Sequence, residues 1–160
     1  MLHMYRYNWL VREEWFEWCK ELSNEQLLET RAGGVGSILQ TLFHIVDVEC
    51  SWIRAIEGKA DLSPEFADNM TLDKIRGLSG DYRQDVEPFV ASWSPDKELE
   101  IVRAPWMNGE PVAAGEVLRH LIAHEIHHAG QLSVWARGLG RQAVSANLIG
   151  RGLLQPDRAK

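Results

Sequence analysis

Cysteine, unbroken apolar stretches and a surplus of positive charge are all scarce in this 160-residue chain. Its two cysteines are too few for a disulfide framework. No stretch approaches the roughly 18 consecutive apolar residues of a membrane-spanning helix, so we expect no membrane partner. The 17 lysines and arginines are outnumbered by 23 acidic residues, and the resulting net charge of −6 argues against a nucleic-acid partner.

The N-terminal residues also lack the apolar segment of a secretory signal, because acidic residues appear from Glu13 onward. We therefore expect a cytoplasmic protein with reduced thiols. The length of the chain and its 45% hydrophobic content are sufficient for a single domain over residues 1–160 with its own core. Cys19 and Cys50 lie in apolar stretches and are expected to be inert core residues.

The spacing of the apolar residues predicts an all-α fold. Four long helices are expected, with a short helical segment between the first two, over residues 5–22, 25–30, 38–57, 71–93 and 113–139. Ser37 is a natural N-cap for the second long helix, whereas Pro88 is expected to kink or shorten the third. Four long amphipathic helices in one domain predict a four-helix bundle.

Two further features refine this architecture. In the first helix, Trp9, Phe16 and Trp18 stand among Arg12 and three glutamates, which we interpret as an amphipathic pattern. The long connection between the third and fourth long helices contains Asn108-Gly109, a turn signal that predicts a small hairpin. Connections of this length are more often functional than idle.

Histidine is concentrated in the fourth long helix, where four of the six histidines fall within nine residues. At about 100° per residue, His124 and His128 fall at the edge of the apolar stripe and within it, whereas His120 and His127 fall outside its centre. Two imidazoles one turn apart can share one metal ion. The alternative, a pair of satisfied core histidines, would desolvate two imidazoles where apolar residues would pack at no such cost.

A third ligand is then expected from another helix. His3 lies at a terminus that is expected to fray, so His44, in a mostly apolar part of the second long helix, is the best candidate. Three neutral imidazoles leave at least one coordination position open, as catalytic sites do. This donor set does not distinguish Zn²⁺, Ni²⁺, Fe²⁺ and Mn²⁺.

The run from His124 to His128 also matches the H-E-x-x-H signature of zinc hydrolases. That mechanism takes its third ligand from downstream, and the chain has no glutamate or further histidine beyond His128. Three roles remain open for Glu125. These roles are to orient a ligand histidine, to act as an acid or base near the metal, or to pair with an arginine of a neighbouring helix.

Two segments resemble motifs of the DinB/YfiT-like family. Residues 36–45, which read GSILQTLFHI and continue to Glu49 and Trp52, are similar to the second-helix motif of that family. Residues 120–132 are similar to its fourth-helix signature. The resemblance implies a four-helix bundle, a homodimer and a divalent-metal site carried here by His44, His124 and His128.

Members of this family with assigned chemistry are S-transferases or isomerases that use low-molecular-weight thiols. The resemblance therefore implies a small-molecule substrate and a thiol cofactor, with the metal helping to form a thiolate that attacks an electrophile. Trp106, in the long connection, is expected to fold over the mouth of such a site. The competing hypotheses are a non-enzymatic metal-binding bundle of a stress response and, with less support, a metal-dependent hydrolase.

Overall fold

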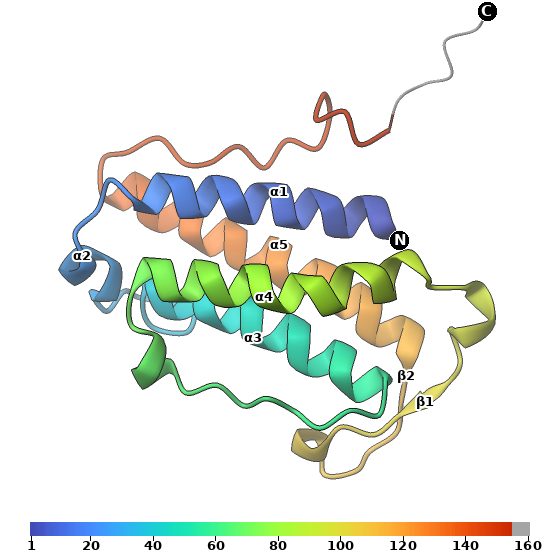
Figure 1. The fold of residues 1–160 in the computed structure, drawn as a ribbon. Helices are drawn as coiled ribbons and strands as arrows, with labels where there is room; N and C mark the ends of the chain where they lie inside the picture. Colours follow the sequence, from blue (N-terminus) through green and yellow to red (C-terminus); the bar gives the residue numbers. More distant parts are fainter. Residues whose placement is uncertain (155–160) are drawn as a thin grey trace, which may run out of the picture.

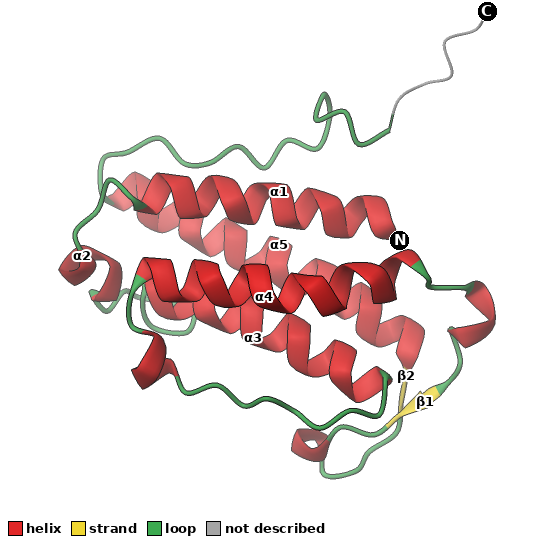
Figure 2. Ribbon diagram, viewed as in Figure 1, coloured by secondary structure: helices red, strands yellow, loops and turns green. Residues whose placement is uncertain are grey.

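Four long helices lie side by side and form the body of the molecule (Figure 1), and Figure 2 shows how little strand accompanies them. This computed structural model describes residues 1–154. Its helices are α1 (Leu2–Cys19), α2 (Asn24–Leu28), α3 (Ile38–Ile56), α4 (Leu72–Ala91) and α5 (Ala114–Gly138). The predicted all-α bundle is confirmed. Within the described residues, no helix is long and apolar enough to cross a membrane.

The helices begin where side chains satisfy their first free N–H groups. The hydroxyl of Ser37 accepts a hydrogen bond from the N–H of Gln40 at 3.1 Å, and this cap starts α3. At α2, Ser23 and Gln26 form a reciprocal capping box, in which each side chain accepts a bond from the other's backbone N–H. Both start signals were present in the sequence.

α4 continues through Pro88, so of the two effects predicted for this proline, a kink or a shortened helix, the shortening at Pro88 is wrong. The helix ends at Ala91, three residues after the proline. A proline inside a helix removes a single N–H donor, and the turn that follows it is closed by other bonds. The N–H of Ser92 lies 3.0 Å from the carbonyl oxygen of Pro88 and 3.2 Å from that of Phe89.

The long connection between α4 and α5 folds into the predicted hairpin. Its strands are β1 (Ile101–Val102) and β2 (Val112–Ala113), which pair antiparallel. At the turn Asn108 and Gly109 both have positive φ, 54° and 76°, the backbone conformation that an Asn-Gly pair adopts most readily. Because β2 runs directly into α5, the hairpin lies at the N-terminal end of that helix.

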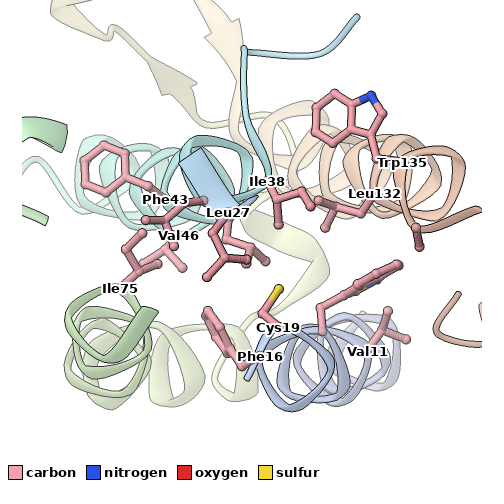
Figure 3. Packing of buried hydrophobic residues seen from close by; sticks show 14 of the residues in the cluster. Val11, Phe16, Cys19, Leu27, Ile38, Phe43, Val46, Ile75, Leu132 and Trp135 are labelled. Carbon is pink, nitrogen blue, oxygen red and sulfur yellow. The ribbon is translucent and has the colours of Figure 1, made fainter. Parts of the chain in front are cut away.

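The apolar core consists of two clusters, one toward each end of the bundle. Figure 3 shows part of the first, where Phe16 and Cys19 of α1 face Leu27 and Ile38. Cys19 and Cys50 are buried free thiols, as predicted, and burial raises the pKa of each to about 12.

A glycine fixes the loop that leads into α3. Gly34 has φ of +64°, and a Cβ at this position would lie 2.8 Å from the ring of Trp135 on α5. The indole N–H of Trp135 also donates a 3.0 Å hydrogen bond to the carbonyl of Ala32. Only a residue without a side chain allows the loop to lie this close to α5, and α3 therefore starts from a defined place on its partner helix.

Candidate metal centre

Three histidines from two antiparallel helices turn their rings toward one point. The Nε2 atom of His124 lies 3.1 Å from that of His44 on α3 and 3.1 Å from that of His128, one turn further along α5. One nitrogen from each of the three rings lies within 4.8 Å of the others. These are the three residues that the sequence singled out, and we call them the histidine triad.

The spacing and the hydrogen bonding of the triad fit a divalent metal ion. Imidazole nitrogens at the usual distance from a tetrahedral zinc ion lie about 3.3 Å apart, close to the two separations of 3.1 Å. Hydrogen bonds among the three rings satisfy these nitrogens poorly. Nδ1 of His128 donates to Gln131, so Nε2 of the same ring is an acceptor. A single N–H at Nε2 of His124 would then have to serve both His44 and His128, whereas a cation accepts the lone pairs of all three rings.

The surroundings keep these three rings neutral. Burial, together with the neighbouring His128 and His44, lowers the pKa of His124 to about 3. Burial also lowers the pKa of His44 and of His128. A histidine binds a metal ion through its neutral form, so the lone pairs of the triad are available at ordinary pH.

Gln131 holds one ligand ring in place, a role that the sequence analysis did not assign. Its Oε1 accepts a 2.8 Å hydrogen bond from Nδ1 of His128, which directs Nε2 of that ring toward the triad. Its amide nitrogen donates to Nε2 of His127 at 2.9 Å. The sequence contained one indication of this role, because Gln131 follows His128 by three residues and this spacing places both on one face of α5.

The other histidines lie outside the triad. His120 and His127 are exposed, which agrees with their predicted positions outside the centre of the apolar stripe. The ring of His120 nevertheless stands one turn from His124, with 5.5 Å between ring centroids. Trp106 is 42% exposed and packs edge-on against Trp52, with centroids 5.1 Å apart.

A second polar cluster is sealed inside the bundle and is built around Arg12. The guanidinium donates to both oxygens of Glu125, at 2.8 and 2.7 Å, and to Glu49 at 3.0 Å. Trp9 donates its indole N–H to the other oxygen of Glu49, and the guanidinium also lies within 3.4 Å of the hydroxyl of Ser79. We call these five residues the Arg12 cluster.

Arg12 corrects the sequence interpretation, which grouped it with the glutamates as part of the polar pattern of α1. The residue is only 3% exposed. It lies four positions before Phe16 and seven before Cys19, on the stripe that faces the core, and this spacing was the available signal. Of the roles left open for Glu125, the structure shows the third, a pair with an arginine of a neighbouring helix.

This pairing bears on the hydrolase hypothesis. An H-E-x-x-H hydrolase uses its glutamate to activate water beside the metal. Both carboxylate oxygens of Glu125 instead accept bonds from Arg12. Burial raises the pKa of Glu125, and the positive charge of Arg12 opposes the change. The carboxylate therefore serves the interior of the bundle rather than the triad.

Comparison with known proteins identifies the family. The family model described as "DinB family" matches residues 1–155. The chain belongs to the DinB family. It is also 51% identical over 153 residues to the uncharacterized protein YizA of Bacillus subtilis, with 96% of each chain covered.

A solved DinB-like structure shares the fold. The crystal structure of a DinB-like protein from Bacillus cereus has a TM-score of 0.61 to this chain at 19% identity, and the match covers 84% of this chain and 89% of that one. The resemblance read from the two DinB motifs is therefore confirmed. DinB membership and the histidine triad are together compatible with binding of a metal ion.

Proposed function

We propose that this DinB protein binds one divalent transition-metal ion through His44, His124 and His128 and uses it to transfer the sulfur of a low-molecular-weight thiol to an electrophilic small molecule. The observation that carries the proposal is the convergence of three neutral imidazoles, which no further histidine, cysteine or carboxylate side chain joins among the described residues. A three-ligand site with an open position is typical of catalytic metal centres.

The roles of the residues follow from the geometry. When bound, a divalent ion supplies positive charge that favours the thiolate form of a thiol in the open position. His44 and the α5 pair fix that position between α3 and α5, and Gln131 keeps the ring of His128 oriented. The Arg12 cluster holds α1, α3, α4 and α5 together behind the triad.

The reaction is a nucleophilic substitution. The sulfur lone pair forms a carbon–sulfur bond while the bond from that carbon to the leaving group breaks. The leaving group departs with its electron pair, and the proton of the thiol passes to solvent. No oxidant or reductant is consumed.

Elemental analysis of natively purified protein is the first test, and we expect about one equivalent of zinc, nickel, iron or manganese per chain. A panel of cellular thiols with a generic electrophile then tests transfer. Conjugation that depends on the metal supports the proposal. Full metal occupancy without conjugation by any thiol would favour the non-enzymatic metal-binding bundle instead.

The proposal extends to a cytoplasmic homodimer. Two apolar side chains on the outer face of α5 support a second copy as the partner, since Ile126 is 41% exposed and Val134 is 63% exposed. Covering such side chains is a common reason for association. Analytical ultracentrifugation of the protein and of a Val134→Glu variant tests this, because the charge should shift a dimer toward monomer.

A further inference from the structure

A cavity of about 260 Å³ opens beside the triad, between α3, α5 and the hairpin. Its lining combines apolar side chains with one histidine and one acid. The lining residues are Trp52, Met107, Val112, Glu116, Val117 and His120.

The cavity and the triad lie along the same interface between α3 and α5. On α3, Trp52 follows His44 by two turns, and on α5, His120 precedes His124 by one turn. One turn of helix rises about 5.4 Å, and the rings of His120 and His124 are 5.5 Å apart between centroids. A small molecule with its reactive carbon at the triad can therefore place its remaining atoms in the cavity.

The walls suit a flat apolar group. Trp52 lines the cavity, and the ring of Trp106 packs against it at an interplanar angle of 85°. Met107 adapts its shape readily to a ligand, and the buried Val117 closes the floor. A cavity of about 150 Å³ lined by apolar residues accommodates benzene, so 260 Å³ holds one aromatic ring with its substituents.

The charge of the lining residues favours an uncharged ligand over an anionic one. It contains no lysine or arginine, and its one ionisable acid, Glu116, is exposed at the rim. An anionic group would lose its hydration here without gaining a cationic partner. A thiol cofactor that carries carboxylates gains nothing from this cavity, whereas an uncharged ring is buried against tryptophan, methionine and valine.

We propose that this cavity binds the ring of the electrophile, so that the substrates are neutral, single-ring aromatic compounds or molecules of similar size and flatness. The inference rests on the proposed function in one respect, since it takes the triad as the place of reaction. The hairpin supplies part of the wall through Met107 and Val112, and it is therefore a specificity element of the site.

Binding can be measured without metal or turnover. In fluorine NMR titrations of the metal-free protein, we expect the neutral probe para-fluorobenzyl alcohol to bind about tenfold more tightly than the anion para-fluorobenzoate. Met107→Gln and Val112→Gln should each weaken binding of the neutral probe by about fivefold or more. Ile149→Gln, an apolar position in the segment after α5 that is 85% exposed and does not line the cavity, is the matched control and should leave binding unchanged.

Turnover provides the second arm, with para-nitrobenzyl chloride and iodoacetamide as electrophiles; each loses halide with its electron pair. Met107→Gln should raise KM for the aromatic electrophile and leave iodoacetamide unaffected. Equal binding of the two fluorinated probes, or cavity variants without effect on either arm, would overturn the inference. Probe binding that follows the expected pattern without any conjugation leaves the cavity assigned and rejects the transferase proposal alone.

Discussion

The histidine triad and the Arg12 cluster are two groups of polar side chains supplied in part by the same two helices, α3 and α5, yet they are completed in opposite ways. In the Arg12 cluster every carboxylate oxygen of Glu49 and Glu125 accepts a hydrogen bond from within the chain. In the triad, three neutral rings present nitrogen lone pairs to one another. Buried polar groups normally find partners inside the protein, and the triad, unlike the Arg12 cluster, leaves nitrogen lone pairs that a cation would satisfy.

The position of each group in the bundle fits this contrast. The Arg12 cluster lies between the two apolar clusters, with Trp9 and Phe16 on either side of Arg12 along α1. The triad lies toward the surface, where His44 and His124 are only partly buried. The triad is therefore the more exposed of the two groups. The comparison therefore predicts that substitutions in the Arg12 cluster affect folding and that those in the triad affect metal content.

The largest expected effect is the loss of metal from the triad. His44→Ala, His124→Ala and His128→Ala should each reduce metal from about one equivalent to near zero, because two imidazoles do not complete a stable site. The exposed His120→Ala and His127→Ala are the matched controls and should retain most of the metal. Elemental analysis of all five variants checks this, and full retention by His44→Ala would contradict the assignment.

Substitutions in the Arg12 cluster should lower the stability of the fold. Arg12→Met leaves two buried carboxylates without their cation and should lower the free energy of unfolding by about 3–5 kcal/mol. Arg76→Met removes a partly exposed arginine that pairs with Glu13 and Glu17, and it should cost about 0.5 kcal/mol. Urea denaturation of the metal-free proteins measures both. Equal losses in the two variants would remove the distinction between the sealed cluster and the surface.

An intermediate effect is expected from the side chain that supports the triad. Gln131→Met keeps a similar volume but removes the acceptor for Nδ1 of His128, and metal affinity should fall by about 10–100-fold. Gln131→Glu retains an acceptor and should keep the affinity near that of the unmodified protein. Competition with a chelator gives both constants. Similar weakening by the two variants would mean that Gln131 acts through packing rather than through the hydrogen bond.

The smallest effect concerns Asp47, which lies one turn after His44. Its Oδ1 is buried without a hydrogen-bond partner, and burial together with Asp61 raises its pKa to about 6. A raised pKa means that the folded state favours the protonated acid, so stability is lost as the pH rises through 6. For a half-buried group, Asp47→Asn should therefore add about 1 kcal/mol at about pH 7.5.

The gain from Asp47→Asn should vanish below about pH 4, where the acid is protonated in both the folded and the unfolded states. Asp81→Asn, an exposed position on α4, is the control and should change little at either pH. Chemical denaturation at the two pH values measures the difference. An equal gain at both would show that the charge of Asp47 is not its cause.

Much of the fold could be predicted from local sequence signals. Ser37 and the Ser23–Gln26 pair mark helix starts because capping bonds span only three residues, and Asn108-Gly109 marks a turn for a similar local reason. The inward direction of His124 and His128 follows from helical periodicity alone. Such features depend on neighbours along the chain, which the sequence displays directly.

The partners across the bundle were harder to predict. Arg12 finds Glu125 across 113 positions of sequence, and nothing near either residue indicates the other. Its charge suggested a solvent-facing position, whereas burial depends on the two carboxylates that α3 and α5 provide. The continuation of α4 through Pro88 has the same character, because packing against α3 outweighs the loss of one hydrogen bond.

The use of α5 in both polar groups has a consequence for the order of events during synthesis. His44 is translated 80 residues before His124, and Arg12 is translated 113 residues before Glu125. Until α5 leaves the ribosome, the nascent chain carries one of the three rings of the triad and an arginine that lacks one of its carboxylates. Assembly of the triad and closure of the interior therefore both wait for α5, and the emerging chain has no complete triad that could capture an ion too early.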